Sequence, residues 1–123
     1  MSWRERPNAP AAGTVLAAVA DLPADDGLER RFGDGPRAFR LVLFRVGEGV
    51  RAYVDECPHA RVSLAFAPGV YCVQDGGGGR DLLCPHHAAM FELDGGLCWD
   101  GPCRGERLAA VDVVVQDEIV RVG

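Results

Sequence analysis

Two short motifs in the sequence combine a cysteine, a proline and a histidine. The first is Cys57-Pro58-His59, and the second is Cys84-Pro85-His86-His87. Thiolates and neutral imidazoles bind transition metals, and each proline fixes the backbone φ angle at a bend. Both motifs are therefore typical of metal-binding loops. The candidate ligands are Cys57, His59, Cys84 and His87.

This ligand set suits two kinds of metal centre. A 2Fe-2S cluster can be held by two thiolates on one iron and two imidazoles on the other, and each loop would supply one ligand of each kind. Zinc also accepts two cysteines and two histidines, but zinc-binding sequences normally group like residues as C-x-x-C and H-x-x-x-H. The spacing favours the cluster, and zinc remains the alternative metal.

The segments that must position these motifs have the composition of β-strands. Apolar, β-branched and aromatic runs occur at residues 14–19, 37–46, 50–55, 70–74, 80–84, 90–93, 97–99, 108–116 and 119–122. Glycine-rich turns at 47–49, 76–79 and 94–96 predict hairpins, two of which lead into the motifs. No segment shows helical periodicity, so we expect an all-β protein built as a small antiparallel β-sandwich.

The length of the chain, 123 residues, predicts one domain. Residues 1–12 are rich in Pro and Ala without periodicity, and we expect a loose N-terminal arm there. Residues 13–123 form the single domain, whose metal-binding part spans about residues 56–103.

Composition excludes several classes of function. The net charge is -5, and all 13 basic residues are arginines without a long basic run, which argues against nucleic-acid binding. The sequence has no apolar stretch of membrane-spanning length and no signal-peptide pattern, so we expect a cytoplasmic protein away from membranes. Asp55 and Glu56 beside the first motif suggest an acidic rim for a basic partner, although ordinary solvated charges are the default interpretation.

Five cysteines without a secretory signal favour metal binding or free thiols over a disulfide framework. The candidate ligands account for two of them. We expect the other three to be buried free thiols that do not bind iron: Cys72, Cys98 and Cys103.

The motifs resemble the signature of the Rieske family, C-P-H-x-G-x-x-L and C-x-x-H-G-x-x-F. The first corresponds to residues 57–64 and the second to residues 84–91, followed by Gly96 and by Gly101-Pro102. The resemblance spans roughly residues 14–122 and implies the Rieske iron-sulfur fold, with one 2Fe-2S cluster at the tip of two loops and histidine ligands facing solvent. Arg61 and Ala88 stand where family members usually have glycine, so we expect the two loops to sit slightly differently.

In the respiratory-complex branch of that family, two extra cysteines brace the cluster and a serine hydrogen-bonds a bridging sulfide. This chain has Val62 and His86 in place of the cysteines and Ala89 in place of the serine. Fewer hydrogen bonds to the cluster favour a low reduction potential, on the order of -150 mV.

The resemblance implies a soluble one-electron carrier, similar to the ferredoxin component that passes electrons from a flavin reductase donor to an oxygenase-type acceptor. Such a carrier is an electron-transfer component rather than a stand-alone catalyst. A terminal oxygenase is disfavoured, because its second iron site needs two more histidines and the chain has three in all. Two alternatives stay open, an accessory subunit similar to the small subunit of nitrite reductase, and a zinc-binding or metal-free interaction module.

Overall fold

The computed structural model describes residues 2–58, 61–76, 79–86 and 88–123. Within these residues, ten β-strands form three antiparallel sheets, and the helices are three single 3-10 turns. The prediction of an all-β protein is confirmed. In the described part of the chain, no helix has the length and apolar character needed to cross a membrane.

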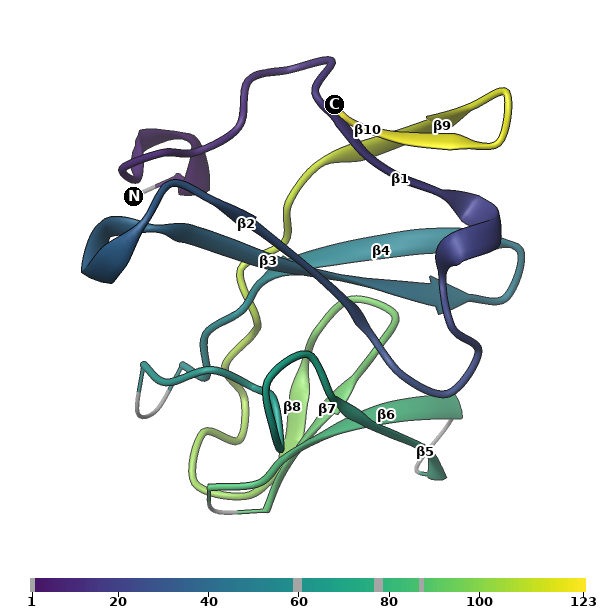
Figure 1. Cartoon of the computed structure of the whole chain (residues 1–123). Helices are drawn as coiled ribbons and strands as arrows, with labels where there is room; N and C mark the ends of the chain where they lie inside the picture. The colour runs from purple at the N-terminus through teal and green to yellow at the C-terminus, as the bar shows by residue number, and fades with distance from the viewer. Residues whose placement is uncertain (1, 59–60, 77–78, 87) are drawn as a thin grey trace.

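The three sheets have the strand orders β1-β10-β9, β2-β3-β4 and β5-β6-β7-β8. They stack as layers, with the sheet β2-β3-β4 in the middle (Figure 1). The strands are β1 (Val15–Ala18), β2 (Leu28–Phe32), β3 (Phe39–Val46), β4 (Gly49–Val54), β5 (Cys72–Gly76), β6 (Gly79–Cys84), β7 (Ala89–Glu92), β8 (Cys98–Asp100), β9 (Val113–Gln116) and β10 (Ile119–Val122). The 3-10 turns are η1 (Trp3–Glu5), η2 (Val19–Asp21) and η3 (Gly35–Arg37).

The middle sheet is buried on both faces. Successive side chains of a strand point to opposite faces, so the apolar run in β3 supplies two cores. Leu41 and Leu43 pack with β1 and β10 in one core, which we call the base core and which lies in the upper part of Figure 1. Val42 and Phe44 pack with the sheet β5-β6-β7-β8 in the other core, which we call the lower core. This sheet therefore joins the base core to the part of the molecule that carries the motifs.

Each predicted strand run overlaps a strand of the structure, and β2 is the strand that the sequence did not predict. Its sequence, Leu28–Phe32, lacks apolar alternation because it lies at a sheet edge, where Arg30 donates a hydrogen bond of 2.6 Å to the carbonyl of Leu16. The run 108–116 forms a named strand only at β9, another edge strand, where Val114 and Val115 are exposed.

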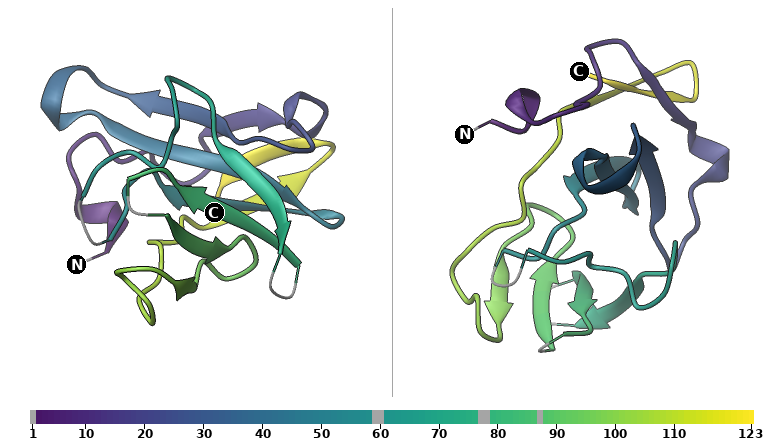
Figure 2. Two further views of the ribbon diagram at one scale, coloured as in Figure 1. Left: turned by 90° about the horizontal axis from the view of Figure 1, so that it is seen from below. Right: turned by 60° about the vertical axis from the view of Figure 1, so that its left-hand side comes forward.

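The segment expected to form a loose arm contains η1. Ser2 and Glu5 form a capping box around this turn, and the ring of Trp3 lies 5.9 Å from the ring of Phe39, with Trp3 itself buried. Arg4 donates hydrogen bonds to Asp112 at 3.1 Å and to the carbonyl of Gly123 at 2.9 Å. The described part of this segment thus packs against β3 and the C-terminus (Figure 2).

Candidate metal centre

The first motif follows β4 in a segment that we call cluster loop 1, residues 55–64, of which 59 and 60 lie outside the described residues. Cys57 is fully buried there. Its N–H donates to the carbonyl of Val62 at 2.7 Å, and the N–H of Arg61 donates to the carbonyl of Cys57 at 2.7 Å. These bonds turn the chain back on itself, and Arg61 adopts a φ of 55° at the turn.

The second motif lies in cluster loop 2, residues 84–88, which begins at the last residue of β6 and leads to β7; residue 87 lies outside the described residues. Cys84 ends β6, pairs in register with Ala89 of β7, and is fully buried. Ala88 has a φ of 55°. Arg61 and Ala88, the two departures from glycine, therefore both keep the positive φ that glycine adopts without strain.

The two cluster loops contact each other. The Nε2 atom of His86 lies 3.2 Å from the carbonyl oxygen of Ser63. Because a carbonyl only accepts hydrogen bonds, this nitrogen carries the hydrogen. Cys57 and Cys84 also belong to one apolar cluster of buried residues. The structure thus brings a buried cysteine from each loop into the same lower core.

Asp55 holds cluster loop 1 in place from within the protein. It is 2% exposed and accepts three hydrogen bonds, from Ser63 Oγ at 2.9 Å, from the N–H of Leu64 at 2.8 Å and from Tyr71 Oη at 2.8 Å. Burial and then the charge of Asp55 raise the pKa of Tyr71, so its hydroxyl remains a donor.

The expectation of an acidic rim at residues 55 and 56 is wrong. Asp55 faces inward because three donors satisfy it there, and Glu56 lies between two arginines, with Arg6 at 3.1 Å and Arg61 at 3.7 Å. The carboxylates beside the first motif are therefore occupied by partners within the chain. The sequence did not reveal this role of Asp55, because its partner Tyr71 is distant in sequence and belongs to no recognisable motif.

A third loop, after β8, closes over the start of β7. A Cβ atom added at Gly101 would lie 2.7 Å from the Cα of Ala89, and Gly101 has a φ of 105°, so glycine is required at this contact. In this loop the thiol of Cys103 donates to the sulfur of Cys98, 3.1 Å away. Burial raises the pKa of Cys103 to about 12, with smaller contributions from Cys98 and Cys57.

The prediction of free thiols at the remaining cysteines is confirmed. Cys98 and Cys103 are buried, and Cys72 is half-buried.

The candidate ligands are only partly described by the structure. Cys57 and Cys84 are described, whereas His59 and His87 lie outside the described residues. Among the described residues, no three His, Cys, Asp or Glu side chains gather as metal ligands. Two buried thiols on two contacting loops nevertheless fit the cysteine half of the ligand set for a 2Fe-2S cluster.

Comparison with known proteins decides the family. The family model of the Rieske 2Fe-2S domain matches residues 13–116, which is most of the chain. The chain belongs to the Rieske family. Its cofactor is accordingly one 2Fe-2S cluster per chain. No curated protein sequence matched this Rieske protein.

Several solved structures have the same fold. A chain from the complex of reduced oxygenase and oxidized ferredoxin in carbazole 1,9a-dioxygenase is 27% identical, with a TM-score of 0.62 over 89% of this chain and 99% of that chain. The ferredoxin of carbazole 1,9a-dioxygenase from Nocardioides aromaticivorans IC177 is 24% identical, with a TM-score of 0.62 over 92% and 98%. A protein from Mycobacterium tuberculosis described as an NADH-dependent nitrite reductase small subunit is 24% identical, with a TM-score of 0.66 over 89% and 91%.

Proposed function

We propose that this Rieske protein is a one-electron carrier whose cluster is bound by Cys57, His59, Cys84 and His87. The observation that carries the proposal is the meeting of the two cluster loops, each with a buried cysteine and each closed by a residue of positive φ. A bound Rieske cluster supplies reversible one-electron chemistry. The chain's own residues hold the loops together, through Asp55 in loop 1 and through the contact between His86 and Ser63.

The partners follow from the same proposal. The match to a chain of an oxygenase–ferredoxin complex supports an oxygenase-type acceptor. We also propose a flavin reductase as the electron donor and the cytoplasm as the location, because the free thiols at Cys72, Cys98 and Cys103 suit a reducing compartment. Lacking the bracing cysteines and the serine, the protein should have a low reduction potential, on the order of -150 mV.

A second candidate is an accessory subunit of a nitrite reductase, favoured by the similarity to the small subunit from Mycobacterium tuberculosis. The presence of all four candidate ligands in the sequence favours the carrier.

The test is an EPR spectrum of the dithionite-reduced protein with an iron and zinc analysis. We expect about two iron atoms per chain and the signal of a 2Fe-2S cluster with mixed nitrogen and sulfur ligation. The signal should be lost in His59→Ala and in His87→Ala. The matched control is His86→Gln, which removes the neighbouring imidazole but keeps a side-chain N–H for the carbonyl of Ser63, and should keep the signal. A zinc-loaded protein without iron from iron-replete cells would refute the proposal.

A further inference from the structure

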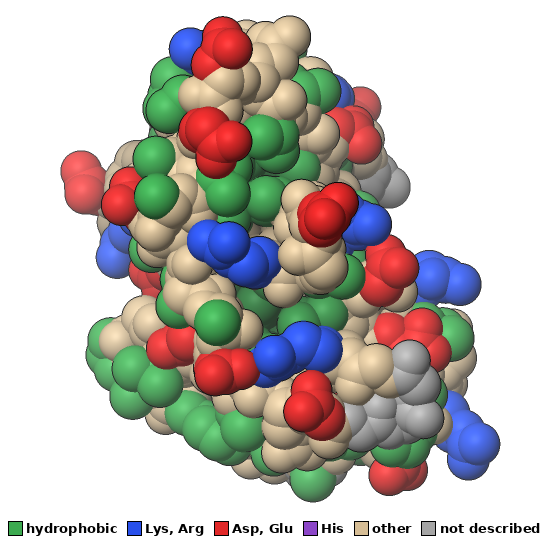
Figure 3. Space-filling model, turned by 90° about the vertical axis from the view of Figure 1, so that its right-hand side faces the viewer, with side chains coloured by type: hydrophobic (Ala, Val, Ile, Leu, Met, Phe, Trp, Pro, Cys, Tyr) green, Lys and Arg blue, Asp and Glu red, His purple; other side chains and the backbone are tan. Residues whose placement is uncertain are grey.

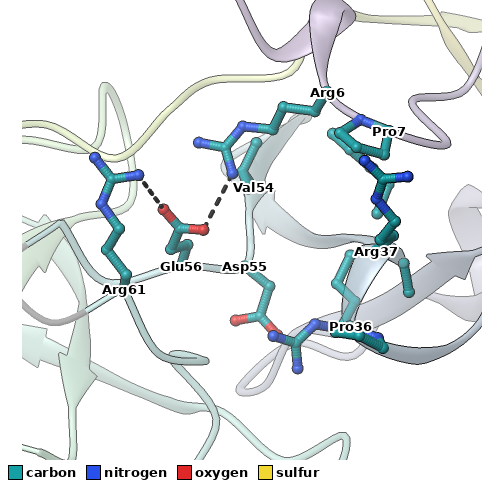
Figure 4. Close-up of a pocket in the computed structure, with 11 residues that line it drawn as sticks. Arg6, Pro7, Pro36, Arg37, Val54, Asp55, Glu56 and Arg61 are labelled. Carbon is teal, nitrogen blue, oxygen red and sulfur yellow. Dashed lines mark hydrogen bonds and ion pairs between the residues drawn. The ribbon is translucent and has the colours of Figure 1, made fainter.

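A groove beside cluster loop 1 has an unusual lining for an acidic protein. It encloses about 770 Å³ between the N-terminal segment, η3, the start of β3 and the loop after β4. Its charged lining consists of Arg6, Arg37, Arg40, Arg61, Asp55 and Glu56, and we call it the arginine groove (Figure 4).

Partners within the chain neutralise only part of this charge. Glu56 is engaged by Arg6 and Arg61. Asp55 is buried and directs its oxygens to Ser63, Leu64 and Tyr71. The groove therefore holds four guanidiniums against two carboxylates that are both already engaged.

Arg37 and Arg40 carry the excess charge. Both residues are exposed, and within the described part of the chain neither guanidinium makes an ion pair or a hydrogen bond. A guanidinium is a planar fork of donors that matches a carboxylate bidentately. These two side chains are thus ready to bind an anionic group from outside.

The opposite side of the molecule differs. There, acidic, basic and apolar side chains are interspersed (Figure 3). The chain as a whole has a net charge of -5. A local positive groove on a negative protein gives an acidic partner a single preferred approach, because complementary charge steers the encounter and fixes its orientation.

The arginine groove also borders cluster loop 1, which carries two of the proposed ligands. Arg61 lines it from cluster loop 1, four residues after Cys57. We propose that the arginine groove receives an acidic segment of the redox partner protein, with Arg37 and Arg40 as its contacts. This proposal rests on the proposed electron-carrier function and names the docking chemistry of its partner.

The test uses two small oxidants of opposite charge, the trianion ferricyanide and the trication tris(phenanthroline)cobalt(III). Stopped-flow rates of oxidation of the reduced protein are measured at low ionic strength. The double substitution Arg37→Gln/Arg40→Gln should lower the ferricyanide rate about fivefold and should not lower the cobalt rate, because it removes positive charge beside the cluster loop. The matched control, Arg51→Gln/Arg121→Gln, removes the same charge outside the groove and should change the ferricyanide rate less.

A peptide probe separates an acidic segment from simple anions. Hexaglutamate should slow ferricyanide oxidation of the native protein more than sodium sulfate does at equal ionic strength, and this difference should vanish in Arg37→Gln/Arg40→Gln. Equal effects of the groove and control substitutions, or equal effects of hexaglutamate and sulfate, would overturn the proposal. Failure of the electron-carrier function looks different, since no EPR signal and no oxidation by either complex would then be seen.

Discussion

Arg61 and Ala88 occupy equivalent places in the two cluster loops, each four residues after a cysteine. Both have a φ of 55°, in the left-handed region where a side chain costs roughly 1–2 kcal/mol. Such strain persists only where surrounding contacts determine the backbone. In this protein the loops supply such contacts. They are the backbone hydrogen bonds of Cys57 in loop 1 and the pairing of Cys84 with Ala89 in loop 2.

Ala88→Gly is therefore expected to stabilise the protein. Ala88 is exposed, so the substitution loses little packing, and the relief of strain outweighs the added freedom of the unfolded chain by about 0.5–1 kcal/mol. Thermal melts followed by circular dichroism measure the change. Ala109→Gly, at an exposed position without positive φ, is the control and should lower the melting temperature. A similar loss in both variants would show that residue 88 is unstrained.

At the scale of elements, Tyr71 connects three parts of the chain. Its hydroxyl lies 2.8 Å from Asp55 in cluster loop 1 and 3.3 Å from Glu29 in β2, and Tyr71 itself precedes β5. Burial, followed by the charge of Asp55, raises the pKa of Tyr71 above 10.0 in the folded state. The folded protein therefore binds this proton more tightly than the unfolded chain does.

Stability should accordingly fall as pH rises above about 10, the pKa of tyrosine in the unfolded chain. Tyr71→Phe removes the hydrogen bond to Asp55 and should cost about 1–3 kcal/mol at pH 8. Because phenylalanine does not ionise, the variant should lose stability less steeply above pH 10, and the gap between the two proteins should narrow. Tyr53, whose pKa is also raised by burial, leaves some alkaline loss in the variant. Denaturant unfolding between pH 8 and pH 11 tests this, and a constant gap would contradict it.

The strands were predictable where local pattern and burial agree. The run of β3 reads as a strand because Leu41–Phe44 is apolar on both faces, and the turn glycines placed the hairpins. β2 was not predictable, since Glu29 and Arg31 interrupt its apolar pattern at a sheet edge.

The candidate site was likewise predictable only in part. Cysteine and histidine are conspicuous in a sequence, so the motifs could be found from residue types and spacing alone. The inward role of Asp55 and the arginine groove could not, because their partners come from segments distant in sequence. The packing of Trp3 on Phe39 could not be predicted either, because a single tryptophan gives no hydrophobic periodicity that would indicate burial.

At the scale of the whole molecule, the two cores have different compositions. The lower core contains Cys57, Cys84, Cys98 and Cys103, whereas the base core contains no cysteine among its described residues. The middle sheet lies between them. Binding of a metal group is coupled to the folding of the residues that hold it, so the two cores should respond differently to loss of the cluster.

Cys84→Ser, which removes a proposed ligand, should therefore loosen the lower sheet selectively. Amide hydrogen exchange should accelerate in β5, β6, β7 and β8 and change much less in β1, β9 and β10, because the base core packs around apolar residues such as Leu16, Val120 and Val122. The control is Cys72→Ser, a half-buried cysteine outside both motifs, which should leave the pattern of exchange intact. Uniform acceleration across all three sheets would mean that the molecule unfolds as one unit and that the middle sheet transmits the loss of the cluster to the base.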